Sequence, residues 1–341
     1  MAQSLAVRYR PKTLNELVGQ TITVEILKKQ IENKTFKNAY LFSGPSGVGK
    51  TSGARIFARM INNGVGDPIE KDATTFGVDD ARNLAEEARQ RAIAGEYKIF
   101  IIDECHRLGG DKKDAWNALL KVIEECPKYT IFIFCTTDPQ KIPDTIFSRV
   151  QRFNFTRVSA NAIKERLAYI CRSEGFTNYE ESVDYISKIA NGGLRSAISM
   201  LEKCVSLDTN LNINNVLKAL GNYSYEVFFS LVNALIDGSE GRVLQIISEF
   251  YNDGHDLKLF VDQFLDFILN VCKFILFGNT TLTTFPNSFT DSLKNCTNFD
   301  NPQNYYTYLV DRVLELKNRL KNDSNPKSTI EASFLLIARG A

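Results

Sequence analysis

The sequence has no paired cysteine motif, almost no net charge and only two histidines, and each shortage excludes something. The seven cysteines are odd in number and scattered, with no C-x-x-C pair, so we expect neither a disulfide framework nor a structural zinc site. The 41 Lys+Arg and 40 Asp+Glu residues nearly cancel. No overall positive field therefore points to nucleic acid, and any such contact must come from local patches.

Long apolar segments are scarce as well. The N-terminal MAQSLAVRYRPK has no apolar signal core, and the most hydrophobic stretch, residues 257–277, is interrupted by Lys258, Asp262, Asp266 and Lys273. Charges at such short intervals argue against a membrane span and for a buried or interfacial helix. We therefore expect a cytoplasmic protein without membrane contact.

A glycine-rich motif, SGPSGVGKTS, follows the apolar run at residues 39–42. It fits G-x-x-x-x-G-K-[ST], and a helical pattern follows it at residues 53–61, so backbone N–H groups and a helix N-terminus can face phosphate. The sequence predicts that Lys50 reaches the β- and γ-phosphates and that Thr51 offers its hydroxyl to Mg²⁺. The predicted nucleotide-binding residues of this loop are Gly44, Pro45, Ser46, Gly47, Val48, Gly49, Lys50, Thr51 and Ser52.

An acidic pair ends the second apolar run, YKIFIID at residues 97–103. We expect Asp103 to hold Mg²⁺ and Glu104 to orient and activate an attacking water, because phosphoryl transfer needs positioning and charge stabilisation. Adjacent acids favour hydrolysis over transfer to a small acceptor. His106 is a weaker candidate for a base, since no fitting nucleophile accompanies it, and a polar residue at a strand end or helix start is favoured.

The order of elements predicts an α/β domain followed by helices. Buried strands at residues 39–42, 97–103 and 130–135 alternate with helices, which implies a parallel sheet covered by helices. Strand patterns fade after residue 158, and a long irregular loop is expected at residues 280–302. The expected domains are an α/β nucleotide-binding domain (1–157), a small helical lid (158–221) and an all-helical collar (222–341).

Several separated segments match one family in order. They are RYRPKTLNELVGQ (8–20), the loop at 44–51, IIDECHRL (101–108), NALLKVIEECP (117–127), CTTDPQKIPDTIFSR (135–149) and GGLRSAISMLEK (192–203). The chain resembles the gamma/tau subunits of the bacterial DNA polymerase III clamp loader, which are AAA+ ATPases. The resemblance is strong over residues 5–205 and continues as helical character beyond.

The resemblance implies further site residues. Arg8, Tyr9, Pro11 and Val18 match the N-terminal segment that packs around adenine. Thr136 matches sensor 1, a polar group near the γ-phosphate. Arg149 matches the arginine finger that reaches a neighbouring subunit's nucleotide, and Arg195 matches sensor 2 on the lid. For the two arginines, a surface ion pair and a helix cap remain the alternatives.

Two departures from the family pattern are visible. Family members usually carry a four-cysteine zinc module, whereas residues 61–71 here are short and contain no cysteine, so no zinc is expected. Val150 also replaces the cysteine that usually follows the finger arginine. Replication factor C small subunits and viral clamp loaders lack the zinc module too, so they stay open as alternatives.

The resemblance implies ATP and Mg²⁺ as ligands and a sliding clamp, other loader subunits in a pentamer, and primer–template DNA as partners. DNA contact should be independent of sequence, because no base-reading motif or aromatic stacking platform is visible. Candidate basic residues at helix starts are Arg82, Arg89, Arg107, Lys112 and Lys113, each of which could equally sit on a solvated helix face.

The leading hypothesis is a clamp-loader ATPase subunit that opens the clamp and places it on DNA. One rival is another AAA+ motor acting on DNA, such as a branch-migration motor, which predicts a hexamer. A non-hydrolysing structural subunit is a second rival, but such members tend to lose the loop lysine or the acid pair. A small-molecule kinase would leave Arg149 and Arg195 unexplained.

Overall fold

The computed structural model describes residues 3–108, 113–280 and 282–340. The chain forms two units, one of Met1–Ser173 with Ala190–Glu202 and one of Glu174–Ile189 with Lys203–Ala341. The first unit carries the sheet, and the described part of the second is helical. The three-domain division expected from the sequence stays a prediction.

The first unit is built on a five-stranded parallel sheet, which confirms the expected α/β class. Its strands are β1 (Ala39–Ser43), β2 (Ile69–Asp72), β3 (Lys98–Asp103), β4 (Thr130–Thr136) and β5 (Gln151–Asn154), in the order β2-β3-β4-β1-β5. Ser43 pairs with Thr136 and Asp72 with Asp103. The carboxyl ends of the strands therefore meet along one edge, where open α/β sheets bind ligands.

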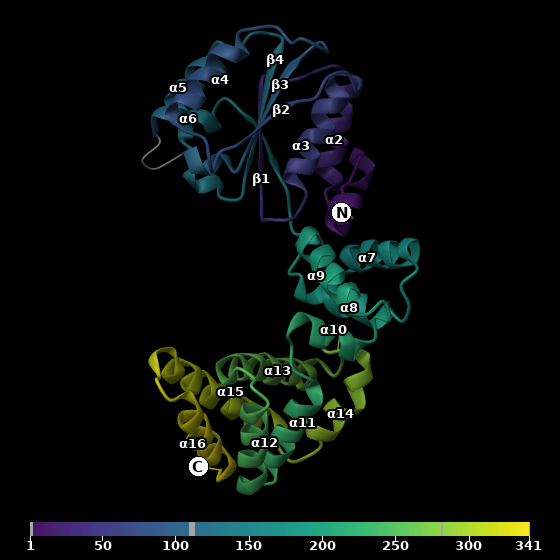
Figure 1. The fold of residues 1–341 in the computed structure, drawn as a ribbon, viewed down its shortest axis with the longest axis vertical. Helices are drawn as coiled ribbons and strands as arrows, with labels where there is room; N and C mark the ends of the chain where they lie inside the picture. The colour runs from purple at the N-terminus through teal and green to yellow at the C-terminus, as the bar shows by residue number, and fades with distance from the viewer. Residues whose placement is uncertain (1–2, 109–112, 281, 341) are drawn as a thin grey trace. The chain divides into compact units, whose positions relative to one another are not determined.

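Helices cover both faces of this sheet (Figure 1). They are α2 (Thr21–Glu32) and α3 (Lys50–Ile61) on one face, and α4 (Val78–Ala88), α5 (Lys113–Glu124) and α6 (Asp144–Phe147) on the other. Successive strand residues alternate between the faces: Phe42 and Ile101 pack with α3, whereas Leu41 and Ile102 pack on the α4 and α5 side. Burial on both faces explains why these strands are continuous apolar runs.

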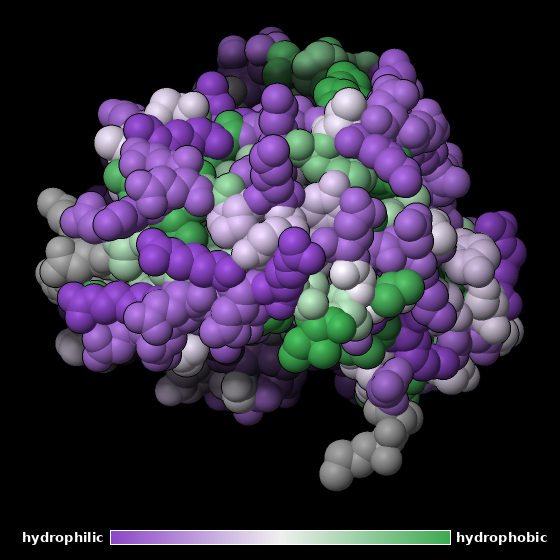
Figure 2. Space-filling view, turned by 90° about the horizontal axis from the view of Figure 1, so that it is seen from above, coloured by the Kyte–Doolittle hydropathy of each residue, from purple (hydrophilic) through white to green (hydrophobic). Residues whose placement is uncertain are grey.

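The first unit contains further elements outside these two helical layers. They are α1 (Leu5–Arg8), η1 (Leu14–Glu16), η2 (Cys105–Leu108), η4 (Pro139–Lys141), most of α7 (Ala160–Glu174) and the first part of α9 (Leu194–Leu207). The face of the molecule in Figure 2 is largely hydrophilic, and hydrophobic residues form small separate groups on it. In the first unit, buried apolar side chains form two clusters, one on each face of the sheet.

The second unit packs helices around a phenylalanine-rich core. Its elements are α8 (Glu180–Ile189), α10 (Ile213–Leu220), α11 (Tyr225–Ile236), α12 (Glu240–Asn252), α13 (Leu257–Phe277), η5 (Asn287–Phe289), α14 (Thr290–Cys296), α15 (Pro302–Arg319), η6 (Leu320–Asn322) and α16 (Pro326–Ala338). Phe260, Phe264 and Phe267 of α13 are buried, whereas Asp262 and Asp266 are exposed. This one-sided pattern is that of an amphipathic helix with one face in a core.

Two expectations about this unit can be compared with the structure. In the described part of the chain, no helix has the length and apolarity needed to cross a membrane. The long irregular loop expected at residues 280–302 is wrong in part, because η5 and α14 lie inside it. The apolar residues of this segment are few, but Phe285, Phe289 and Leu293 are buried, and their burial stabilises these short helices.

Candidate nucleotide-binding site

The glycine-rich loop joins β1 to α3 at the carboxyl edge of the sheet. Gly44 has φ of 145°, and a Cβ there would lie 2.1 Å from the carbonyl oxygen of Phe155, so no other residue fits. Gly49, with φ of 102°, caps the N-terminus of α3 in a left-handed conformation. The loop therefore brings the backbone amides of a helix start toward the edge, as the sequence predicts for a phosphate site.

Lys50 is folded back over this loop. Its Nζ donates to the carbonyl oxygens of Gly44 at 2.8 Å and Pro45 at 2.7 Å, and the residue is buried. Burial lowers the pKa of the Lys50 amine, while the nearby Glu104 and Asp103 carboxylates act in the opposite direction. The ammonium is thus held beside the loop by two of the loop's own carbonyls.

Thr51 and Asp103 meet across the loop and the end of β3. The Thr51 hydroxyl donates to Asp103 Oδ2 at 2.8 Å. Burial raises the pKa of Asp103, and the hydrogen bond from Thr51 partly offsets that rise. Two hard oxygen donors at this spacing fit the ligands that Mg²⁺ prefers, so these residues would hold the ion that the motif implies.

Glu104 stands in an uncommon backbone conformation, with φ of 48°. Its side chain is 34% exposed, and Oε2 accepts a hydrogen bond from the Thr137 hydroxyl at 3.0 Å. His106 Nδ1 lies 3.3 Å from the same oxygen. A left-handed conformation at a residue other than glycine persists only where its surroundings fix it, and such residues concentrate at functional sites.

Thr136 and Thr137 have different places at the end of β4. Thr136 is fully buried, and its Oγ1 accepts from the Asp138 backbone N–H at 3.0 Å. It does not line the cavity described below, so its sensor 1 role stays a prediction. Thr137, the first residue after β4, is not among the predicted site residues, although it lies inside the matched segment 135–149.

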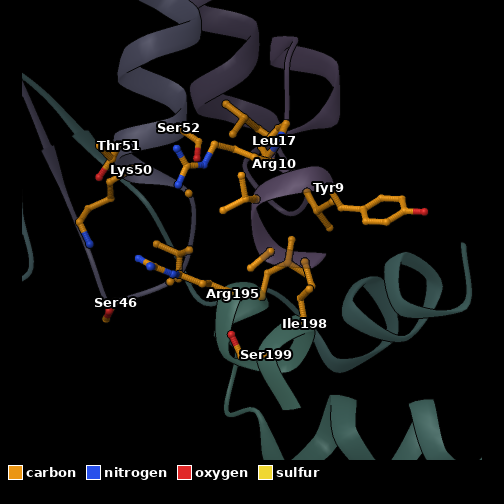
Figure 3. A pocket seen from close by; sticks show the side chains of 18 of the residues that line it. Tyr9, Arg10, Leu17, Ser46, Lys50, Thr51, Ser52, Arg195, Ile198 and Ser199 are labelled. Carbon is orange, nitrogen blue, oxygen red and sulfur yellow. The ribbon is translucent and has the colours of Figure 1, made fainter. Parts of the chain in front are cut away.

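A cavity of about 480 Å³ lies over the loop and the acidic pair, within the first unit (Figure 3). Of the predicted loop residues, Ser46 to Ser52 line it, whereas Gly44 and Pro45 do not. Arg195 of α9 also lines it, and the Arg195 backbone N–H donates to the Gly47 carbonyl at 3.2 Å. The start of α9 is therefore in direct contact with the loop, where a lid residue would act.

The N-terminal segment forms another wall of this cavity. Tyr9, Pro11 and Val18 line it, together with Leu17, which the sequence analysis did not select. Arg8 does not line it, and its guanidinium lies 5.8 Å from the Tyr9 ring centroid. In Figure 3 the Tyr9 ring points away from the loop, so adenine contact by these residues stays a prediction.

Arg10 is a further cavity residue that the sequence analysis missed. In Figure 3 its side chain extends toward Thr51 and Ser52. Its pKa is lowered by burial, and then by the positive charges of Arg55 and Arg195. Several cations thus converge on one cavity, an arrangement that attracts a polyphosphate.

Arg149 lies outside this cavity. Its guanidinium forms an ion pair with Glu124 Oε1 at 2.6 Å and donates to the Thr145 carbonyl at 2.7 Å. Both ion-pair partners are partly exposed, with 37% and 41% of their side chains accessible. Within its own subunit, Arg149 is therefore not part of the site, and its role as a finger stays a prediction.

The basic residues considered for DNA contact are only partly described. Arg82 pairs with Asp79 at 3.3 Å, and Arg89 and Arg107 are exposed. The expected position near a helix start is wrong for Arg89, which caps the C-terminus of α4. Lys112 and the side chain of Lys113 lie outside the described residues. In the described ranges, no three His, Cys, Asp or Glu residues gather closely enough to hold a metal ion without other ligands.

The strand order, the loop between β1 and α3 and the acids at the end of β3 define an AAA+ type P-loop domain. The Thermotoga maritima RuvB Holliday junction branch migration motor matches this fold with a TM-score of 0.52 and 20% identity, over 67% of this chain and 79% of that one. At this identity the match shows the fold alone.

Comparisons with family models and with curated relatives identify a narrower family among the AAA+ proteins. A model of the DNA polymerase III delta subunit matches residues 66–159, and one of DNA polymerase III subunits gamma and tau, domain III, matches residues 211–298. DNA polymerase III subunit tau of Bacillus subtilis is 36% identical over 78% of this chain and 51% of its own length. That of Escherichia coli is 32% identical over 72% of this chain and 42% of its own length.

The chain belongs to the family of DNA polymerase III gamma and tau subunits. It spans about half the length of the curated relatives it matches. The resemblance that the sequence motifs indicated is confirmed.

Proposed function

We propose that this chain is an ATP-hydrolysing subunit of a clamp loader, which opens a sliding clamp and places it on primer–template DNA during replication. One observation carries the ATPase part: the Thr51 hydroxyl lies 2.8 Å from Asp103 Oδ2, with Lys50 and Glu104 beside them. Its relatives, named as DNA polymerase III subunits, support the replication part.

Each site residue has a distinct part in this proposal. Lys50, Arg10 and Arg195 neutralise phosphate charge, and Glu104 orients the attacking water toward the γ-phosphate. Thr51 and Asp103 hold Mg²⁺, which when bound neutralises developing charge on the phosphate oxygens. Tyr9, Pro11 and Val18 form the wall for the adenosine end of ATP.

The partners in this proposal are other loader subunits in a pentamer, a sliding clamp and DNA. Arg149 completes the site of a neighbouring subunit, because it lies outside the cavity of its own. The exposed Arg89 and Arg107 contact DNA phosphates without reading bases. The protein works in the cytoplasm of a bacterial cell or of a bacterial cell infected by a virus.

A branch-migration motor is the second candidate function, because the RuvB fold covers 67% of this chain. The matched relatives by sequence are DNA polymerase III subunits, which favours the clamp loader. Native mass spectrometry distinguishes the two, since a motor of that type assembles as a hexamer and a clamp loader as a pentamer. A viral clamp loader like a replication factor C small subunit stays a variant of the first proposal.

Lys50→Ala tests the proposed function. We expect ATP hydrolysis, measured with primed DNA and a sliding clamp, to fall by at least about 100-fold, because the phosphate charge loses its buried partner. Lys29→Ala, at an exposed position of α2, is the matched control and should retain wild-type hydrolysis. Unchanged hydrolysis in Lys50→Ala would refute the site, and no response to either DNA or clamp would refute the loader assignment.

A further inference from the structure

His106 connects two polar groups that stand on different elements. Its Nδ1 lies 3.3 Å from Glu104 Oε2 and 3.3 Å from Thr136 Oγ1. The imidazole is buried, with 8% of its side chain exposed, and it does not line the nucleotide cavity. A group so placed does not face the cavity, which argues against a role as catalytic base.

The neighbouring carboxylate favours a hydrogen on His106 Nδ1. A lone pair on Nδ1 would face the Glu104 carboxylate, and two acceptors at this distance repel each other. A hydrogen on Nδ1 would face both Glu104 Oε2 and Thr136 Oγ1, each of which lies 3.3 Å from the nitrogen. Thr136 Oγ1 has two lone pairs, and the Asp138 backbone N–H already occupies one of them.

We propose that His106 is a positioning residue, which fixes the Glu104 carboxylate by donating from Nδ1 while Thr136 anchors the ring. The inference rests on the proposed ATPase function. Glu104 needs such support because its backbone is left-handed, with φ of 48°. The Thr137 hydroxyl binds the same oxygen from the other element, at 3.0 Å, so two donors on different segments define one carboxylate position.

Loss of His106 should slow the chemical step of ATP hydrolysis without weakening ATP binding. His106 contacts Glu104 but none of the cavity-lining loop residues in the described hydrogen bonds, so its loss should leave ATP binding intact. A misplaced carboxylate lowers the rate without changing the affinity for the ground state. The signature is therefore a lower kcat at a constant nucleotide Kd.

Three substitutions separate positioning from general packing. His106→Asn places an amide N–H near the position of Nδ1, His106→Gln places it near Nε2, and His106→Leu removes the donor. We expect kcat to fall by about 10- to 100-fold in the Leu and Gln variants and by less than about 3-fold in the Asn variant. The Kd of a fluorescent ATP analogue should stay within about 2-fold in all three.

A fourth variant tests whether His106 acts through Glu104. In a Glu104→Gln background, His106→Leu should cause no further loss of kcat, because residues that act as a unit are not additive. If His106→Leu fails to fold, as judged by its thermal melting, the Asn and Gln pair decides the question, since both carry the same amide group and one methylene group shifts its position.

Several results would overturn the inference. Equal kcat values in the Asn and Gln variants, a full kcat in His106→Leu, or a parallel loss of kcat and nucleotide affinity would each refute it. These outcomes leave the proposed function standing, provided that the wild-type chain hydrolyses ATP and Lys50→Ala does not. Absence of Lys50-dependent hydrolysis would refute the proposed function itself and, with it, the role of His106.

Discussion

At the scale of single residues, Tyr40 shows how burial controls a titrating group. The ring is fully buried in β1, and its hydroxyl accepts from the Lys37 backbone N–H at 2.8 Å and donates to Gln30 Oε1 at 3.1 Å. Burial raises the pKa of Tyr40 from 10.0 to about 12. The folded state therefore disfavours the tyrosinate form.

Tyr40→Phe should change how stability depends on pH. An acid whose pKa is raised on folding binds its proton more tightly in the folded state. The contribution of Tyr40 to the free energy of unfolding is therefore complete below pH 10.0 and is lost as the pH rises toward about 12. At pH 8 we expect the variant to be less stable by about 1 kcal/mol, through its lost hydrogen bonds. Between pH 9 and 11 that difference should shrink by about 1 kcal/mol. Urea unfolding at the three pH values measures it, and a constant difference would contradict the argument.

Residues in a motif of fixed spacing could be predicted from the sequence, and residues set by tertiary position could not. Lys50, Thr51 and Asp103 fall where the pattern puts them, at the loop and the end of β3. Arg10 and Thr137 lie inside the matched segments 8–20 and 135–149, but no motif spacing gives either of them a role. Their place in the site depends on the path of the N-terminal segment and of the turn just after β4, and both paths are decided by packing.

At the scale of elements, the inner strands could be predicted and the edge strands could not. β3 and β4 are apolar throughout because both faces are covered. β2 reads IEKD and β5 reads QRFN, and within β5 only Phe153 is buried. A short edge strand with exposed polar residues carries no apolar run that the sequence could reveal.

Gly44 joins one of these inner strands to the loop, and its replacement should be severe. In Gly44→Ala the new Cβ would overlap the Phe155 carbonyl oxygen, so β1 or the segment after β5 must move. We expect a loss of at least about 3 kcal/mol of stability, above the usual range for single substitutions. Thermal and urea unfolding of the ligand-free chain measure it.

Gly64→Ala is the matched control for this prediction. Gly64 also has a positive φ, of 80°, but no atom lies within 4 Å of the added Cβ. Only the left-handed backbone is strained there, which costs about 1–2 kcal/mol. Equal losses in the two variants would show that the contact with Phe155 does not constrain the loop.

At the scale of the whole molecule, the proposed function places Arg149 in the site of a neighbouring subunit. Arg149 is held by Glu124 at 2.6 Å on the surface of its own subunit. An exposed ion pair of this kind contributes about 0.2–1 kcal/mol, far less than an arginine gains at a transferring phosphate. A neighbour's nucleotide can therefore draw Arg149 away from Glu124 at small cost. The sequence could suggest this only through family resemblance, because contacts between copies leave no pattern within one chain.

Mixing two inactive variants tests whether the site is shared. Arg149→Ala and Lys50→Ala should each lose at least about 100-fold in ATP hydrolysis. If copies of this chain are neighbours, an interface is active when one chain supplies Lys50 and the next supplies Arg149. In an equal, random mixture about one interface in four meets this condition, so the mixture should regain up to roughly a quarter of wild-type activity. If Arg149 acts on its own nucleotide or only stabilises the fold, mixing restores no activity. Equal melting temperatures of the two variants would then favour action on its own nucleotide over a role in stability. Recovery that depends on total chain concentration would tie Arg149 to assembly, because only association brings it to a second site.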